Sequence, residues 1–445
     1  MSSTQSSPQS SPHSSPTKVA VASMVGTAIE YFDNYIYTMA AVLVFNVQFF
    51  NSDDPVSNQL MSLSVLALAF FTRPMGSIIF GHFGDKYGRK QTLIASLLLM
   101  GLSTVAIGLL PNYAAIGIWA TVLLCLCRIG QGLGLGGEWG GAALAATEHA
   151  PKHKRAFFGI FPQMGAPIGL LLANGAFYLV NLIYGEQAFL DWAWRIPFVA
   201  SLVMIFIGLY IRIKISESPI FLKAEQQGKN RHTPLKTLFS KHFKPFIIGV
   251  LIATAGYVLF YILVAFTPIF VKSPVAVSKA GYATGLGLPA NLYTQYLLIT
   301  SVIFGIAIFF SGLYSDRIGR RLLLLIATGT TVIYGLTMPF FLENGTPTSI
   351  FIFLSIGMIL IGLSFGPMAV ILPELFPTEV RYTGASLAYT AAGILGASVF
   401  TIVAVKINEN FGLFGVGGYL AAASLLSFWA LWQVHETKDL ELAEI

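Results

Sequence analysis

Five charged residues stand inside long apolar stretches of this sequence. They are Glu30, Asp33, Arg73, Arg128 and Glu138. A charge at the centre of a bilayer costs roughly 2.5 to 3.5 kcal/mol even on insertion scales, so each needs a partner or a function. A buried carboxylate can take up and release a proton, and an arginine can hold a carboxylate through two parallel hydrogen bonds. The set therefore predicts proton exchange and anion binding inside a membrane, or alternatively a permanently ionised structural network.

The spacing of these residues predicts how they pair. Glu30 and Asp33 are three positions apart, which places them on one helix face, and we expect both to meet Arg128 near mid-depth. Glu138 lies ten positions beyond Arg128, about 15 Å along a helix axis, at a depth that Arg73 should share. We therefore expect a second pair between Glu138 and Arg73.

The balance of charge in this set suggests a proton site. Three acids against two arginines leave one surplus negative charge, which disappears if one carboxylate is protonated for part of a cycle. We assign that role to Asp33, because burial away from Arg128 favours the neutral acid and pairing with Arg128 favours the carboxylate. Asp33, Glu30 and Arg128 are the predicted proton-coupling residues.

The elements that must position these residues are membrane-spanning helices. Of the 445 residues, 55% are hydrophobic and only 10% are charged, whereas soluble domains average about 25% charged residues. A transmembrane helix needs about 20 mostly apolar residues, and such runs recur almost end to end. The sequence predicts an all-α membrane protein with twelve transmembrane helices in two pseudo-symmetric six-helix bundles. The expected helices cover 19–48, 60–80, 93–111, 114–147, 156–184, 193–213, 246–271, 294–314, 322–342, 349–372, 383–405 and 412–434.

Polar stretches separate the two bundles. Residues 1–18, rich in serine and proline, are expected to form a disordered cytoplasmic tail, and 214–245 a cytoplasmic linker between bundles over 19–213 and 246–434. Residues 435–445 form a second tail. With both termini in the cytoplasm, 20 of the 26 lysines and arginines fall on that side and four fall outside. This bias follows the positive-inside rule, so we expect a multi-pass protein of the cell inner membrane with both termini cytoplasmic.

Two sequence patterns occur once in each half. A glycine, aspartate and arginine pattern over 81–90 returns over 312–321, and Glu-x-x-Pro-x-x-x-Arg over 148–155 returns over 374–381. Glycine permits close helix approach, an aspartate near a helix start complements the helix dipole, and arginine offers a fork to carboxylates. These properties suit a cytoplasmic gate, although the charges could merely set the topology. The predicted gate residues are Gly81, Asp85, Gly88, Arg89, Glu148, Arg155, Asp316, Gly319, Arg320, Glu374 and Arg381.

Longer segments resemble a known family. They are GTAIEYFD (26–33), RPMGSIIFGHFGDKYGRK (73–90), RIGQGLGLGGEWGGAALAATEHAPKHKRAFFG (128–159), DWAWRIPF (191–198) and ELFPTEVRYTGASLAY (374–389). With the repeated loop pattern, they make nearly the whole chain resemble the major facilitator superfamily. Within it the chain resembles the metabolite:proton symporter family, and there the shikimate-like bacterial inner-membrane branch. The resemblance implies a carrier for a small polar metabolite, such as shikimate, α-ketoglutarate, citrate, proline or betaine.

A substrate cavity is expected at mid-membrane between the two halves. The second half contains no charge that must lie mid-membrane, so we expect uncharged polar and aromatic contacts from it. Tyrosines often belong to the interfacial belt and Trp139 could serve ordinary packing, so a structural role is the alternative for each. The predicted cavity residues are Gln131, Glu138, Trp139, Arg73, Tyr257, Tyr261, Gln295 and Tyr389, with Asn291 and Tyr382 as further candidates.

Other kinds of chemistry are not indicated. The sequence contains no Walker phosphate loop and no histidine or cysteine cluster with metal-ligand spacing. The net charge of +6 reports orientation in a membrane protein rather than nucleic-acid binding. We therefore expect no cofactor, no metal, no nucleic-acid partner and no enzymatic activity.

The expected function is proton-coupled import of an organic acid or zwitterionic osmolyte by alternating access. The expected partners are a small-molecule substrate, the proton and the lipid bilayer, and the expected state is a monomer. One alternative is a proton-independent uniporter or exchanger. A polytopic membrane enzyme or a transporter-derived receptor is the other.

Overall fold

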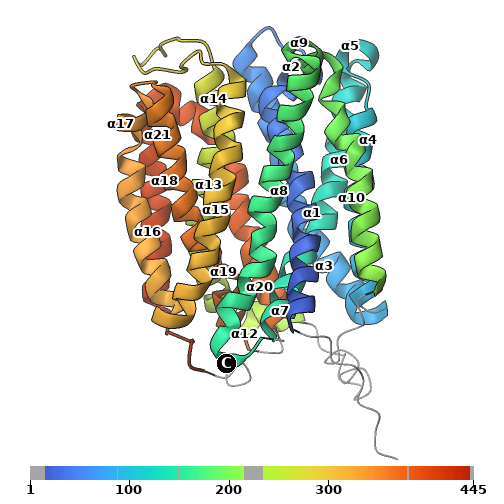
Figure 1. Ribbon diagram of the computed structural model, residues 1–445, viewed down its shortest axis with the longest axis vertical. Helices are drawn as coiled ribbons and strands as arrows, with labels where there is room; N and C mark the ends of the chain where they lie inside the picture. The colour runs from blue at the N-terminus through green and yellow to red at the C-terminus, as the bar shows by residue number, and fades with distance from the viewer. Residues whose placement is uncertain (1–15, 88, 149, 215–233, 378–379, 441–445) are drawn as a thin grey trace, which may run out of the picture.

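The protein is described by a computed structural model that covers residues 16–87, 89–148, 150–214, 234–377 and 380–440. In this part of the chain most residues are helical, and the long helices run side by side along one axis (Figure 1). The predicted tail over 1–18 and linker over 214–245 lie largely outside it. Their described parts include helix: α1 begins at Pro16, and α12 covers Pro234–Lys241. A proline fits the first turn of a helix because its missing N–H has no partner there, so α1 starts inside the predicted tail.

The first half of the chain forms one group of helices. α1 packs against α8, α3 packs against α6, and α4 packs against both α6 and α10. The elements are α1 (Pro16–Leu43), α2 (Phe45–Gln48), α3 (Pro55–Tyr87), α4 (Arg89–Leu109), α5 (Tyr113–Ile116), α6 (Ile118–Leu135), α7 (Glu138–Glu148), η1 (Lys152–Lys154), α8 (Arg155–Tyr184), α9 (Glu186–Ala188), η2 (Phe189–Ala193) and α10 (Arg195–Lys214).

The second half forms the other group. α16 packs against α21, α13 packs against α20 and α21, and α15 packs against α18. After α12, the elements are α13 (Phe243–Tyr261), η3 (Ile262–Phe266), α14 (Thr267–Lys272), α15 (Ala290–Ile318), α16 (Arg320–Leu336), α17 (Met338–Leu342), α18 (Pro347–Phe365), α19 (Met368–Ile371), η4 (Pro373–Leu375), α20 (Arg381–Gly393), η5 (Ile394–Val399) and α21 (Phe400–Trp432).

Eight helical stretches in the described part of the chain are long and apolar enough to cross a membrane. One of them, Arg381–Trp432, is interrupted at Gly412, where φ is 66° and ψ is −168°. Glycine adopts a positive φ readily because it has no Cβ, so this stretch consists of two helical runs. The other seven are Pro55–Phe80, Ile118–Glu148, Arg155–Tyr184, Arg195–Ile213, Phe243–Lys272, Asn291–Ile318 and Pro347–Ile371.

Several sets of helix contacts join the halves, and two of them are the most extensive. α8 packs against α15, and α3 packs against α20 and η5; Figure 1 shows α8 and α15 next to each other at the centre of the molecule. Gly312 allows the first contact, because a Cβ at this position would lie 2.6 Å from Cγ2 of Ile160. The charged helices of the first half therefore face the aromatic residues of α13 and α20 across a central interface.

Candidate functional site

Arg128 is the centre of a buried polar network in the first half. Its side chain projects from α6 and is fully buried. Nη1 donates to Oε1 of Gln131 at 3.0 Å, Nη2 to Oδ1 of Asn34 at 3.2 Å, and Nε to the carbonyl of Leu66 at 3.3 Å. The guanidinium carbon also lies 4.0 Å from the centroid of the Tyr37 ring. All three nitrogens of Arg128 are thus committed to contacts within the first half.

Asp33 does not contact Arg128, so the direct pair expected from the sequence is wrong in this structure. Oδ2 of Asp33 accepts a 3.0 Å hydrogen bond from Oγ1 of Thr104, and Oδ1 has no hydrogen-bond partner in the described part of the chain. Nε2 of Gln131 donates to the same Thr104 hydroxyl at 2.8 Å. Neighbouring residues on a helix point about 100° apart, and Arg128 reaches Asn34 rather than Asp33. The two charges are connected only through Gln131 and Thr104.

Glu138 pairs with an arginine other than the expected one. Its Oε1 forms a salt bridge with Nη2 of Arg212 on α10, whereas Nη2 of Arg73 donates to Oδ1 of Asn34 at 3.3 Å. Arg212 was not among the five charges expected inside the membrane, and it lies two residues before the predicted linker over 214–245. In the structure its side chain is buried, because α10 packs against α1 and α4 along this end.

The burial of Arg212 also corrects the charge count. The set now contains three acids and three arginines, so the surplus negative charge no longer argues for a protonated carboxylate. Glu30 has Arg73 and Arg212 as its electrostatic partners, although its Oε2 accepts no hydrogen bond from the described residues. Asp33 differs from Glu30 because, among the described residues, no arginine is its electrostatic partner. The side chain of Asp33 is buried and accepts a hydrogen bond from the Thr104 hydroxyl.

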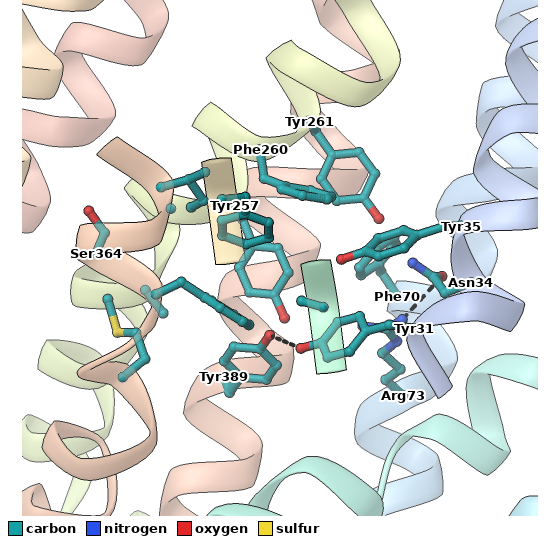
Figure 2. Close-up of a pocket in the computed structure, with 17 residues that line it drawn as sticks. Tyr31, Asn34, Tyr35, Phe70, Arg73, Tyr257, Phe260, Tyr261, Ser364 and Tyr389 are labelled. Carbon is teal, nitrogen blue, oxygen red and sulfur yellow. Dashed lines mark hydrogen bonds between the residues drawn. The ribbon is translucent and has the colours of Figure 1, made fainter. Parts of the chain in front are cut away.

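A cavity lies beside this network, between the two halves (Figure 2). Its lining residues come from both halves of the chain, on α1, α3 and α8 from the first half and on α13, α15, α18, α19 and α20 from the second. In Figure 2, Arg73 and Asn34 approach from one side and Tyr257 and Tyr389 from the other, with the hydroxyls of Tyr31 and Tyr389 3.0 Å apart. The polar residues of the lining are Tyr31, Asn34, Tyr35, Arg73, Tyr257, Tyr261, Ser364 and Tyr389.

Half of the eight predicted cavity residues line this cavity, namely Arg73, Tyr257, Tyr261 and Tyr389. Trp139 does not reach it, because its ring stacks against the ring of Tyr389 with centroids 3.9 Å apart. Its Nε1 donates to Oε1 of Gln163 at 3.1 Å. Trp139 therefore packs behind the lining rather than forming it.

The other predicted cavity residues have partners elsewhere. Gln131 and Glu138 are engaged by Arg128 and Arg212 within the first half. Nε2 of Gln295 lies 3.5 Å from the hydroxyl of Tyr178, between α15 and α8. The two further candidates also lie outside the lining: Asn291 is exposed at the start of α15, and the hydroxyl of Tyr382 donates to the carbonyl of Gly137.

Three lining residues on α1 were missed by the sequence prediction: Tyr31, Asn34 and Tyr35. They interleave with Glu30 and Asp33, and Tyr31 and Tyr35 are one turn apart with ring centroids separated by 5.5 Å. A polar and aromatic cluster around two buried acids in an apolar run was a usable signal. Asn34 is the most informative of them, because its amide oxygen accepts from both Arg73 and Arg128.

At the end of the molecule that the sequence predicts to be cytoplasmic, the repeated Glu-x-x-Pro-x-x-x-Arg patterns meet across the halves. Nη1 of Arg155 lies 2.9 Å from Oε1 of Glu374, and both side chains are buried. In the reverse direction, Arg381 lies within electrostatic reach of Glu148. Nε of Arg320, from the other pattern, lies 3.6 Å from Oε2 of Glu374. Each copy of the pattern therefore supplies a partner to the other copy.

Asp316 holds the start of a helix that belongs to the opposite half. Its Oδ1 accepts from the backbone N–H of Ala156 at 3.0 Å, and its Oδ2 from that of Phe157 at 2.9 Å. These N–H groups begin α8 and have no acceptor within the helix, and a carboxylate there also complements the helix dipole. Gly319, with φ of 101°, makes the turn from α15 into α16.

The C-terminal segment after α21 adds to this cluster. The hydroxyl of Thr437 donates to Oε2 of Glu374, and Nη2 of Arg155 donates to the carbonyl of Leu440. The carboxylate of Glu436 accepts from the backbone N–H groups of Arg320 and Arg321, at 3.1 and 3.0 Å. This segment thus contacts both halves at once.

The first copy of the loop pattern is only partly described. Gly88, and the side chains of Asp85 and Arg89, lie outside the described residues. The backbone places Gly81 and Asp85 in the last turns of α3, and α4 begins at Arg89. Whether these residues contact the second half therefore stays a prediction.

The side chains described above can transfer protons, form charge pairs and form hydrogen bonds. Within them, histidine, cysteine, aspartate and glutamate do not gather in groups of three or more that could hold a metal ion. Cys125 and Cys127 are free thiols on α6. The site is therefore best described as a polar cavity with buried charges on one side.

The known proteins that this chain resembles are all named as transport proteins. The sequence model described as Major Facilitator Superfamily matches residues 23–401. A Haemophilus influenzae protein, named as a metabolite transport protein, is 60% identical over 96% of this chain and 98% of its own length. The Escherichia coli inner membrane metabolite transport protein YhjE is 50% identical over 96% and 95% of the two chains, respectively. The E. coli shikimate transporter is 32% identical over 92% of each.

Solved structures agree on the fold. The proton:xylose symporter XylE, bound to 6-bromo-6-deoxy-D-glucose, superposes with a TM-score of 0.74 over 96% of this chain and 98% of that chain, at 16% identity. A partially occluded inward-open form of XylE from E. coli gives the same TM-score at 17% identity. At this identity the likeness concerns the fold alone.

Proposed function

The chain belongs to the major facilitator superfamily, and from this premise we propose that it imports a small polar metabolite together with a proton by alternating access. It is a transporter rather than an enzyme, as its relatives are. The observation that carries the proton-coupled part is Asp33, a carboxylate that is 1% exposed and has no arginine partner in the described part of the chain. An unpaired buried carboxylate favours its protonated form.

A chain of hydrogen bonds supports the coupling role of Asp33. Arg128 contacts Gln131, Gln131 donates to Thr104, and Thr104 donates to Asp33. The other end of the network is Asn34, which also accepts from Arg73 at the cavity wall. A shift of Arg128 that brought it to Asp33 would favour the carboxylate and release the proton, and the same shift would change the contacts of Asn34. Proton release and cavity geometry are linked in this proposal through shared hydrogen bonds.

The proposal includes a twelve-span arrangement in two bundles over 19–213 and 246–434. The Gly412 break divides one of the eight apolar stretches into two spans, and α1, α4 and α16 would supply three more. The cytoplasmic cluster around Glu374 and the linker would then lie on the side where the positive charge gathers. YhjE, half identical to this chain, is named as an inner membrane protein, which supports the same location here.

The substrate class in this proposal is an organic acid or a zwitterionic osmolyte. The relatives include transporters named for shikimate and for proline and betaine, all of which carry a carboxylate. Arg73 lines the cavity and can receive such a group.

A proton-independent uniporter or exchanger is the second candidate. It is favoured by one observation: three acids and three arginines form a balanced set, which needs no titration for neutrality. In that case the network around Arg128 would be permanently ionised and structural.

Uptake into proteoliposomes separates the two candidates. We expect an inside-alkaline pH gradient to drive accumulation of a transported metabolite by the wild type, screened among shikimate, α-ketoglutarate, citrate, proline and glycine betaine. Asp33→Asn should lose this accumulation at least tenfold and retain counterflow exchange, whereas Asp191→Asn, at an exposed acid, should match the wild type. Gradient-independent equilibration that Asp33→Asn leaves unchanged would contradict proton coupling and support the uniporter.

A further inference from the structure

The cavity wall carries charge of only one sign. Of its described lining residues, Arg73 is the one arginine or lysine, and none is an aspartate or glutamate. Asp33 and Glu30 belong to the same helix as the lining residue Asn34, but neither is part of the wall. A bound molecule therefore touches one cationic side chain and no acidic one, although Glu30, behind the wall, acts electrostatically on Arg73.

Arg73 has hydrogen-bonding capacity that the protein leaves unused. Its Nη2 donates to Asn34 at 3.3 Å, while its buried Nε finds no acceptor among the described residues. The guanidinium carbon lies 4.4 Å from the centroid of the Phe70 ring, which supports one face of the group. A buried donor without a partner costs free energy, and a carboxylate can accept from Nε and from a second nitrogen of the same guanidinium.

Arg128, by contrast, is not available as a receptor. Its three nitrogens already donate to Gln131, Asn34 and the Leu66 carbonyl, and it is not part of the lining. Two arginines meet at Asn34, but only Arg73 has both an unused donor and access to the cavity. A second carboxylate on the same ligand would therefore meet no free cation there.

The opposite wall is aromatic and carries hydroxyl groups. The Tyr257 hydroxyl is buried close to the Tyr389 hydroxyl, and in Figure 2 it points into the same space as the Tyr31 and Tyr389 hydroxyls. The rings of Tyr257 and Tyr389 lie 5.1 Å apart. Such a wall can hydrogen-bond hydroxyl groups and cover a flat or cyclic body, and it supplies no carboxylate to pair with an ammonium group.

From these observations we propose that the cavity binds a hydroxylated monocarboxylate, with Arg73 holding the carboxylate and the Tyr257 hydroxyl bonding the neutral body. This rests on the proposed function in that the cavity is taken as the transport site. It narrows the substrate class by disfavouring dicarboxylates, tricarboxylates and zwitterions. Arg73 and Tyr257 are the two residues that determine specificity.

Equilibrium binding to the purified full-length protein tests this without any proton gradient. The probes are shikimate, gluconate and 4-hydroxybenzoate as monocarboxylates, α-ketoglutarate and citrate as multiply charged acids, and proline and glycine betaine as zwitterions. We expect at least one monocarboxylate to bind tenfold or more tightly than every member of the other classes. Preference for another class, or binding of no monocarboxylate, would overturn the proposal.

Variants locate the two contacts. Arg73→Gln should weaken monocarboxylate binding about 100-fold, Arg73→Lys should weaken it less, and Tyr257→Phe should weaken it several-fold for hydroxylated ligands only. Arg317→Gln, at an exposed arginine, is the matched control, and circular dichroism with a thermal melt checks that each variant is folded. Unchanged affinity in folded Arg73→Gln would overturn the assignment.

The two proposals fail separately. Arg73-dependent binding together with gradient-independent transport would remove proton coupling and leave the monocarboxylate site. Gradient-driven uptake of a zwitterion or a dicarboxylate would support proton coupling. If the folded Arg73→Gln variant still binds that substrate, the monocarboxylate site is excluded.

Discussion

The two ends of the molecule join its halves in different ways. At the end predicted to be cytoplasmic, called the cytoplasmic end below, Arg155, Glu374 and Arg320 form a buried ionic cluster that crosses between the halves, and Asp316 of the second half caps α8 of the first. At the opposite end, predicted to be extracellular and called the extracellular end below, Nζ of the partly buried Lys272 donates to the backbone carbonyl of Val42. No ion pair joins the halves at that end in the described part of the chain.

The difference follows from what each end can pair with. The cytoplasmic end carries two copies of one motif, and each copy supplies an acid and an arginine, so partners exist on both sides. At the other end, Val42 is next to the last residue of α1, where carbonyl groups lack helical partners and the helix dipole favours a cation. Lys272 uses this backbone feature instead of a side-chain partner. We infer that the cytoplasmic closure is the stronger one.

The largest effect should come from Glu374→Gln. This change leaves Arg155 and Arg320 without their shared carboxylate, and breaking a buried ion pair costs about 3 to 5 kcal/mol. We expect the population with an open cytoplasmic end to rise on the order of 100-fold. Spin labels at the exposed positions Tyr210 and Leu322, read by pulsed electron paramagnetic resonance, should report a longer distance.

Glu374→Asp serves as the conservative control for this prediction, because it keeps the charge and should shift the distance less. An unchanged distance in Glu374→Gln would mean that the ionic cluster does not hold the cytoplasmic end closed. The cluster would then only set topology.

Lys272→Met should have a smaller effect, and it should favour opening at the extracellular end rather than at the cytoplasmic end. The substitution keeps the length of the side chain and removes its bond to the Val42 carbonyl, and hydrogen bonds to charged groups contribute about 1.5 to 3 kcal/mol. We expect the population of molecules open at the extracellular end to rise roughly tenfold. Spin labels at Ile183 and Phe340 should then report a longer distance in a larger fraction of molecules. Lys272→Arg should restore closure; if it opens as far as Lys272→Met, the contact is not electrostatic.

Asp316→Ala should have the smallest effect. It removes a helix cap, which typically contributes about 0.5 to 2 kcal/mol, while the Arg155 to Glu374 pair stays in place. The cytoplasmic distance between the Tyr210 and Leu322 labels should lengthen in a several-fold larger fraction of molecules. Asp316→Asn, which retains acceptor capacity, should lie between the wild type and Asp316→Ala; an equal effect of both would implicate the charge rather than the cap.

Combining Glu374→Gln with Lys272→Met sharpens the comparison. The two sites are at opposite ends and share no partner, so their free energies should add. The double variant should return part of the way toward the wild-type distribution. A double variant that behaves like Glu374→Gln alone would show that only one end controls the equilibrium.

The helix positions predicted from the sequence agree with the structure better than the predicted charge pairs do. Apolar runs of about 20 residues predicted most helices to within a few residues, because burial in lipid demands this length and composition wherever a span occurs. The family was confirmed by the match over 23–401. Twelve spans and the bundle boundaries stay predictions, since eight stretches meet the length and composition criteria in the described residues.

The pairing of buried charges was the part that failed. Depth along a helix was estimated from spacing, but the direction of a side chain depends on how each helix is rotated against its neighbours. Arg128 therefore went to Asn34 rather than Asp33, and Glu138 to Arg212 rather than Arg73.

By itself, the sequence determined that this chain is helical and membrane-embedded, and that both halves carry the same acid and arginine patterns. These features are local, since each depends on composition or on spacing within one segment. Only the tertiary structure decided which arginine faces the cavity with an unused donor, and that Lys272 meets the end of α1. Those outcomes depend on the rotation and contact of helices far apart in the chain, which no single segment specifies.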